Sequence, residues 1–160
     1  MPLWQIFHPT DAYTPEDKKV LANRITALYE KSNLPKFYVV TVFHPVPADS
    51  IYVGGEPRSN FVRFKIDQMA RTMSGQILRD WWMRRVEDVI APFVKERGLE
   101  SEVQIDELPA DLWTMNGLVP PPFESHAEKR WAKENKASAY TDDEMMSSGF
   151  RAGPGITGGR

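Results

Sequence analysis

The segment "FYVVTVF", residues 37–43, is the most β-prone stretch of this 160-residue chain. Its aromatic and β-branched side chains follow one another almost without interruption, which is typical of a buried parallel strand. A second strand-like run, "LWQIF" at residues 3–7, is short, apolar and aromatic-rich, and it stops at His8-Pro9. The two segments predict a pair of strands, and the residues between them decide how the strands are joined.

A helical pattern separates the two segments. Thr14, Pro15, Glu16 and Asp17 supply an N-cap, a proline at the first helical position and acids in the first turn. Apolar side chains then recur at helical spacing until Asn33-Leu34-Pro35, namely Leu21, Ile25 and Leu28. Strand, amphipathic helix and strand together make a βαβ unit.

The same pattern occurs a second time. "FVRFKI" at residues 61–66 predicts a strand, a helix is expected to open at Ser74 and to close at Gly98 with a kink at Pro92, and a last strand is expected at residues 102–105. The apolar residues of this helix are Ile77, Leu78, Trp81, Trp82, Val86, Val89, Ile90, Phe93 and Val94.

Two βαβ units of similar length indicate an internal duplication and an α/β (α+β) fold, with a four-stranded sheet and two helices on one face. The strand sequences read as apolar on both sides, so we expect copies of the same chain to cover the bare face. This domain spans residues 2–122. A C-terminal extension, 123–160, is expected to hold one helix around residues 127–135 and then a Gly-rich, flexible end.

Composition excludes several classes of function. With 20 Lys+Arg against 22 Asp+Glu there is no basic excess for nucleic acid or a membrane surface. The absence of cysteine excludes disulfides and thiolate chemistry. His8 and His44 both end strand-like runs, but no third ligand has metal-site spacing near either, so we expect neither a metal nor another cofactor. Without a long apolar run, a cytoplasmic protein is expected.

Pro2 directly follows the initiator methionine. Removal of Met1 would leave a prolyl secondary amine at the chain terminus. An α-amino group titrates near pH 8, and burial among Trp4, Phe7 and other apolar groups would lower its pKa, which makes a neutral base available at pH 7. The alternative interpretation is that a proline here only blunts the edge of a strand.

A proline amine at the first strand of a duplicated βαβ unit resembles the tautomerase superfamily, which includes 4-oxalocrotonate tautomerase and macrophage migration inhibitory factor. "MPLWQIFHP", "TPEDKKVLANRITALY", "VGGEP" and "LPADLWTMNGLVP" further resemble the cis-3-chloroacrylic acid dehalogenase branch, particularly its fungal relatives. The resemblance covers roughly residues 2–122. It implies a homotrimer of the tautomerase fold that needs no cofactor.

The resemblance also implies roles for individual residues. Pro2 matches the catalytic proline, and Arg71 matches one of the two arginines that bind the substrate carboxylate. The second arginine is replaced here by Gln68 or Asp67. A guanidinium offers a planar fork that suits a carboxylate, and the start of the following helix adds a favourable field.

Other positions depart from the branch. Tyr29 stands where the branch has a histidine, Gln104 where it has a tyrosine, and Met115 or its neighbour Asn116 where it has a water-activating glutamate. Tyr29 is interpreted either as a hydrogen-bond donor to a substrate oxygen or as a core aromatic residue. Trp113 and Asn116 lie in the loop that closes the pocket in the family, where they could wall the site or bind an enolate oxygen.

These matches predict an isomerase that performs keto–enol tautomerisation on a small carboxylate-containing substrate, a 2-keto acid or a related enol, with Pro2 as the general base. The replaced positions argue against dehalogenation and hydration. Two alternatives stay open, namely a non-catalytic binding or signalling module of the same fold, and a biosynthetic or hydratase–dehalogenase-like enzyme with another substrate.

Overall fold

A computed structural model of the chain describes residues 1–69 and 72–146. The chain divides into two compact units, Met1–Ala110 and Asp111–Arg160, and each is described by itself below. The first unit holds both βαβ units. The boundary at residue 122 that the sequence suggested falls inside the second unit.

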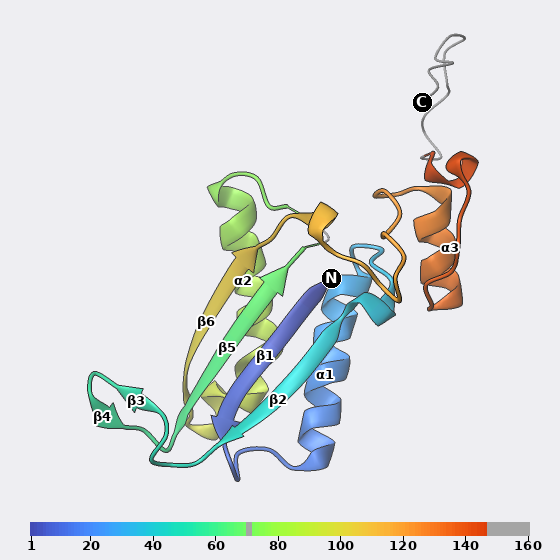
Figure 1. Ribbon diagram of the computed structural model, residues 1–160. Helices are drawn as coiled ribbons and strands as arrows, with labels where there is room; N and C mark the ends of the chain where they lie inside the picture. The colour runs from blue at the N-terminus through green and yellow to red at the C-terminus, as the bar shows by residue number, and fades with distance from the viewer. Residues whose placement is uncertain (70–71, 147–160) are drawn as a thin grey trace. The chain divides into compact units, whose positions relative to one another are not determined.

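The first unit is built on a mixed four-stranded sheet in the order β2-β1-β5-β6 (Figure 1). β1 runs parallel to β2, β5 runs parallel to β6, and β1 and β5 meet antiparallel at the centre. Each βαβ unit therefore supplies one parallel pair, which confirms the predicted duplicated fold. The strands are β1 (Pro2–Pro9), β2 (Val40–Val46), β5 (Phe61–Gln68) and β6 (Glu100–Glu107).

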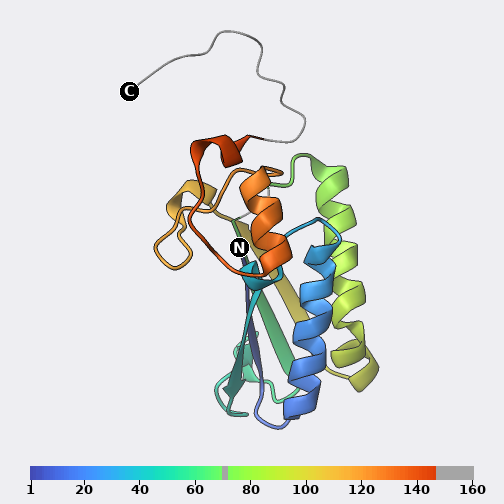
Figure 2. The same cartoon turned by 90° about the vertical axis from the view of Figure 1, so that its right-hand side faces the viewer.

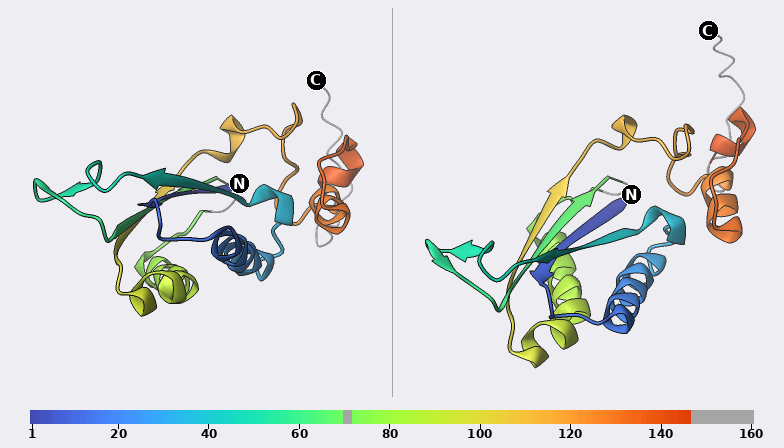
Figure 3. Two further views of the ribbon diagram at one scale, coloured as in Figure 1. Left: turned by 90° about the horizontal axis from the view of Figure 1, so that it is seen from below. Right: turned by 60° about the horizontal axis from the view of Figure 1, so that its bottom comes forward.

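Two crossover helices, α1 (Pro15–Glu30) and α2 (Gln76–Ile90), cover the same face of the sheet (Figure 3). They lie side by side, as Figure 2 shows. α1 begins as predicted, because the Thr14 side chain accepts a hydrogen bond from the Asp17 backbone N–H and the Asp17 carboxylate accepts one from the Thr14 N–H. This reciprocal pair is a capping box.

The ends of α2 differ from the prediction. The N-cap is Gly75, at φ 84°, a residue that has no side chain to cap the helix, and α2 begins at Gln76, so the expected start at Ser74 is wrong. At its other end the α-helix stops at Ile90, and Pro92 lies inside the first of two short 3₁₀ turns that end at the left-handed Gly98. Because proline has no N–H to give to the α-helical ladder, the chain changes helix type here instead of kinking.

The strand predicted at residues 37–43 begins later. Lys36–Tyr38 form a 3₁₀ turn after Pro35, and β2 starts at Val40. β2 is also an edge strand with Val42 exposed, not a strand buried on both faces. The Gly54-Gly55 pair, both at positive φ, turns a small hairpin of β3 (Tyr52–Val53) and β4 (Glu56–Pro57).

The core lies between the sheet and the two helices. Its apolar side chains are at most 1% exposed: Trp4, Ile6, Val62, Phe64 and Ile66 from the strands, and Leu21, Ile25, Val86 and Ile90 from the helices. The first half of α2 does not belong to this layer. Ile77, Leu78 and Trp81 are 87%, 41% and 43% exposed, so these apolar residues of the helix do not pack into the core of the described chain.

The other face of the sheet is polar along β5 and β6, which corrects the expectation of strands that are apolar on both sides. Arg63 pairs with Glu102 and donates to the Gln104 side chain at 2.7 Å. Lys65 contacts the Asp67 and Asp106 carboxylates at 2.5 and 3.2 Å. The reason is the strict alternation of β5, whose odd residues face away from the helices.

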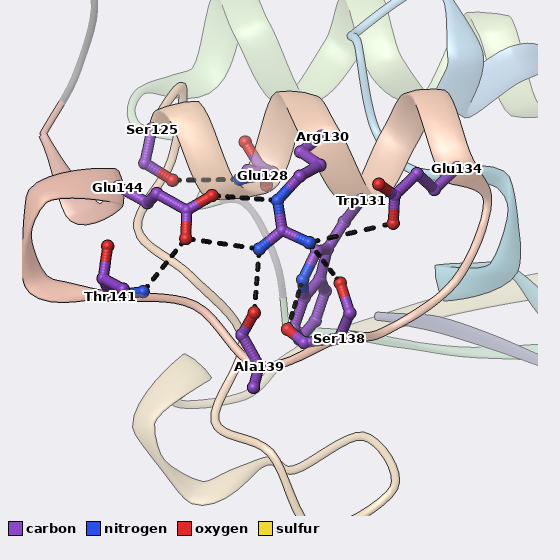
Figure 4. Close-up of polar contacts among 9 residues, drawn as sticks. All are labelled: Ser125, Glu128, Arg130, Trp131, Glu134, Ser138, Ala139, Thr141 and Glu144. Carbon is purple, nitrogen blue, oxygen red and sulfur yellow. Dashed lines mark hydrogen bonds and ion pairs between the residues drawn. The ribbon is translucent and has the colours of Figure 1, made fainter.

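The second unit contains α3 (His126–Glu134), which is the helix expected near residues 127–135. Arg130 ties the following segment to this helix, because its guanidinium donates to Glu144 Oε1 and to the Ala139 carbonyl, each at 2.9 Å (Figure 4). Trp131 Nε1 adds a bond to the Ser138 carbonyl at 2.8 Å. The chain is therefore folded beyond the helix, and the Gly-rich end at residues 149–160 lies outside the described residues.

Candidate active site

Pro2 is the first residue of β1, which lies inside the sheet between β2 and β5. It is buried on the helix side and pairs with Gln68, the last residue of β5. The Met1 carbonyl accepts a hydrogen bond from the Met69 N–H at 3.2 Å, so the ladder to β5 extends to the chain terminus. While Met1 is attached, the Pro2 nitrogen is an amide. It becomes a basic amine once Met1 is removed.

Gln68 stands beside Pro2 in the next strand, and β6 extends the same row of residues with Glu107. The Gln68 carbonyl accepts from the Leu108 N–H at 2.8 Å. The structure therefore brings two of the residues suggested by the resemblance, Pro2 and Gln68, into register at one end of the sheet. Arg71 lies outside the described residues.

A cavity of about 550 Å³ opens between α2 and β6. Its size is that of a small-molecule site. Glu107 Oε1 accepts a hydrogen bond from the Met73 N–H at 2.6 Å, and Arg79 Nη2 lies 3.9 Å from Glu107 Oε2. The residues that line this cavity include Met73, Arg79, Met83, Ile105, Glu107 and Leu108.

Arg79 is a site candidate that the sequence prediction missed. Glu107 became a candidate only because strand pairing places it beside Gln68. Arg79 lies in the first turn of α2. This position in the sequence does not distinguish a substrate-binding arginine from one that is only solvated. The pairing of Glu107 with Gln68 follows from the register of β5 and β6, which local sequence does not fix.

Tyr29 lies in the last turn of α1 and is 4% exposed. Its hydroxyl oxygen accepts a hydrogen bond from Trp4 Nε1 at 3.0 Å, and its ring meets the Trp82 ring edge-on with centroids 5.2 Å apart. Burial raises the pKa of the Tyr29 phenol, so the hydroxyl keeps its proton at neutral pH. Both interpretations of Tyr29 made from the sequence are compatible with this placement.

Gln104 lies on the opposite face of the sheet from Pro2. Its carbonyl oxygen accepts from Arg63 at 2.7 Å, and its amide donates to Asp106 at 3.2 Å. Gln104 pairs with Lys65, which pairs with Gln5, an odd residue of β1, whereas Pro2 is an even one. Within one chain the pleat therefore does not bring Gln104 to the side of Pro2.

Trp113, Met115 and Asn116 belong to the second unit. Met115 and Leu118 exchange two backbone hydrogen bonds, at 2.8 and 3.0 Å, around the tight turn of Asn116 and Gly117. Both turn residues have positive φ, 53° and 79°. An Asn-Gly pair is the preferred sequence for such a turn, so Asn116 has a conformational reason for its identity.

His8 and His44, near the ends of β1 and β2, lie on opposite faces of the sheet. His8 packs against Tyr13 under the sheet, whereas His44 stacks on Phe7 with ring centroids 4.6 Å apart. Within the described residues no group of three or more acidic or histidine side chains is placed to hold a metal ion. The described helices likewise include none that is long and apolar enough to cross a membrane.

Comparison with known proteins places this arrangement in a family. A family profile described as "Putative oxalocrotonate tautomerase enzyme" matches residues 1–136. The crystal structure of native RhCC from Rhodococcus jostii RHA1 is 49% identical, with a TM-score of 0.85, over 86% of this chain and 99% of that chain. A probable enzyme from the thermophilic fungus Aspergillus fumigatus is 38% identical, with a TM-score of 0.83, over 88% and 98%.

A more distant structure, of a member of the cis-3-chloroacrylic acid dehalogenase family, is 17% identical. It covers 81% of this chain and 89% of its own at a TM-score of 0.64, which is a likeness of fold. No curated protein gives a significant match.

Proposed function

This chain belongs to the oxalocrotonate tautomerase family, and we propose that it is an isomerase in which Pro2, freed by removal of Met1, moves a proton between oxygen and carbon in a small keto acid. The observation that carries the proposal is the place of Pro2 at the start of an interior strand, buried and in register with Gln68. A base at this position is held by the pairing of Pro2 with β5, and the next residue, Leu3, pairs with Val40 of β2.

The amine would act as a neutral base. An α-amino group titrates near pH 8, and burial lowers the pKa of a cationic group because it disfavours the charged form. In the conversion of an enol to a ketone, the Pro2 nitrogen accepts the proton of the enol hydroxyl and returns it to the neighbouring carbon. No electron is exchanged. A positioned general base of this kind contributes about 10²–10⁴-fold in rate.

The carboxylate of the substrate needs a cationic partner. The family resemblance assigns this role to Arg71, which precedes the first residue of α2, Gln76, by one short segment. The N-cap residue of α2, Gly75, has no side chain to cap the helix, and a helix N-terminus without such a cap can offer its first backbone N–H groups to an anion. We therefore propose that Arg71 and the start of α2 bind the carboxylate, while Gln68 or Tyr29 contacts the remaining oxygens.

The functional form is proposed to be a homotrimer, as the resemblance implies. The face of the sheet without helices supports this assembly. Phe7 and Val42 lie on its less polar half, on β1 and β2, together with Gln5 and His44, beside the charged half on β5 and β6. Such a surface is typical of an interface with an apolar part and paired charges.

The test begins with intact mass, which should show a chain that lacks Met1. Ketonisation of the enol of phenylpyruvate is then measured for wild type and for Pro2→Ala. We expect Pro2→Ala to lose about 10²-fold or more in kcat. Pro9→Ala, at the other end of the same strand, is the matched control and should retain activity. Equal rates for wild type and Pro2→Ala would instead support a non-catalytic module.

A further inference from the structure

We infer that Trp4 is a positioning residue for the proposed proton transfer and that it acts through its hydrogen bond to the hydroxyl of Tyr29. The inference rests on the proposed function, because it concerns the oxygen of the substrate on which Pro2 acts. It gives Trp4, which the sequence suggested only as apolar surroundings of the Pro2 amine, a role in orienting a hydrogen-bond donor.

The fold places Trp4 and Tyr29 at the Pro2 end of the sheet. Trp4 and Pro2 are two residues apart and point to the same side of β1, which separates them by about 6.6 Å along the strand. α1 runs back along the sheet, and after it the chain enters β2 at Val40, the partner of Leu3. The last turn of α1, with Tyr29, therefore lies at the level of Pro2.

The hydrogen bond fixes the direction in which Tyr29 can donate. An indole N–H is a donor only, so at 3.0 Å the Tyr29 oxygen must be the acceptor. The hydroxyl proton of Tyr29 is then directed away from Trp4, where it would donate to an oxygen of the proposed substrate. A hydroxyl that accepts one hydrogen bond also donates more strongly, because the two bonds polarise each other.

The ring of Tyr29 is held as firmly as its hydroxyl. The Trp82 ring contacts the Tyr29 ring edge-on, with ring centroids 5.2 Å apart. Trp4 in turn makes an edge contact with Phe64, with ring centroids 6.3 Å apart. Burial raises the pKa of the Tyr29 phenol, so the group stays a neutral donor across the pH range in which Pro2 acts as a base. A neutral donor suits an oxygen that gains negative charge during the reaction.

Trp82 provides a matched control for Trp4. Both indoles touch the same tyrosine ring system and both are buried, but Trp82 Nε1 makes no hydrogen bond within the described part of the chain. Replacing Trp82 by Phe removes an indole without removing a bond to Tyr29. Replacing Trp4 by Phe removes an indole of the same size together with that bond.

The experiment compares Trp4→Phe, Trp82→Phe, Tyr29→Phe and the Trp4→Phe/Tyr29→Phe double variant in the processed protein. Ketonisation of phenylpyruvate enol gives kcat and KM, and thermal unfolding reports folding. We expect Trp4→Phe to lower kcat about tenfold, the effect of one hydrogen bond, with KM little changed. Trp82→Phe keeps an aromatic ring beside Tyr29 and removes no hydrogen bond to it, so this variant should stay near wild type in kcat. In the Tyr29→Phe background, Trp4→Phe should add no further loss, because both remove the same interaction.

A readout without substrate tests the bond itself. The chain has five tryptophans, and the indole N–H resonance that disappears in Trp4→Phe is that of Trp4. This resonance should shift in Tyr29→Phe and stay in place in Pro2→Ala. Equal losses in Trp4→Phe and Trp82→Phe, or additive losses with Tyr29→Phe, would overturn the inference and reduce Trp4 to a core residue.

The proposed function fails in a different way. If wild type and Pro2→Ala show equal rates, the proposed proton transfer is wrong and the role of Trp4 falls with it. If activity depends on Pro2 but is indifferent to Trp4→Phe, only the inference about Trp4 is wrong. Should Trp4→Phe fold poorly, Tyr29→Phe, which keeps the ring and loses the hydroxyl, still decides whether that hydroxyl contributes to kcat.

Discussion

At the scale of single residues, the sequence suggested Pro2 as a candidate base, because the chemistry proposed for it depends only on its place behind Met1. The resemblance left Gln68 or Asp67 at the position of the second arginine, and the structure puts Gln68 beside Pro2. No sequence pattern marks Trp4 or Arg79 as a site residue, because their contacts depend on how α1 and α2 pack against the sheet. The face of the sheet on which Gln104 lies could not be predicted either, because strand register sets it and the neighbouring residues in sequence do not.

His8 yields a prediction about pH. It is fully buried, its Nδ1 lies 2.7 Å from the Pro9 carbonyl, and burial lowers its pKa below the ordinary 6.5. The unfolded chain therefore takes up a proton below pH 6.5 that the folded chain resists. We expect the free energy of unfolding to be unaffected by this group above pH 6.5 and to fall as the pH drops below it.

Urea denaturation on both sides of that pH measures the effect. His8→Phe, which keeps an aromatic ring beside Tyr13 and cannot titrate, should flatten the pH dependence. His126→Asn is the control for the loss of a histidine at an exposed position. An unchanged slope in His8→Phe would show that other groups set the pH dependence.

At the scale of elements, the sequence located each strand and helix of the duplicated unit, but not all of their ends. The start of α1 was predictable because Thr14 and Asp17 form a local capping box. The start of β2 was not, since residues 37–39 have strand-like side chains and yet follow Pro35 into a 3₁₀ turn. The apolar residues Ile77, Leu78 and Trp81 fit a helical period while facing away from the core of the chain.

The capping box gives the prediction at this scale. Thr14→Ala removes the oxygen that accepts from the Asp17 N–H and should lower the free energy of unfolding by about 1 kcal/mol. Chemical denaturation measures the difference. Ser32→Ala, just beyond the other end of α1, is the control, because the Ser32 hydroxyl makes no hydrogen bond within the described residues. If both variants lose the same free energy, the cap does not stabilise α1 as proposed.

At the scale of the whole molecule, the sequence predicted that copies of the chain cover the sheet face without helices. The reason given was that the strands are apolar on both sides, which does not hold for β5 and β6. The face is less polar on β1 and β2, and it is charged and internally paired on β5 and β6. The charged half follows from the alternation of β5, in which Arg63 and Lys65 face away from the helices between apolar residues that face toward them. An interface on this face would bury both halves.

The final prediction tests that interface. Val42 lies on the uncovered face of the sheet and Val20 lies on α1, and their exposed fractions are close, 37% and 41%. Light scattering after gel filtration should give three times the 18.3 kDa chain mass for wild type and for Val20→Asp. Val42→Asp should shift the mass toward the monomer, because an unpaired carboxylate at an apolar contact loses its hydration without gaining a partner. Retention of the full assembly in Val42→Asp, or a monomeric wild type, would move the proposed interface away from this face. Since Pro2 starts the neighbouring strand, loss of activity in parallel with loss of mass would further indicate that the site is complete only in the assembled protein.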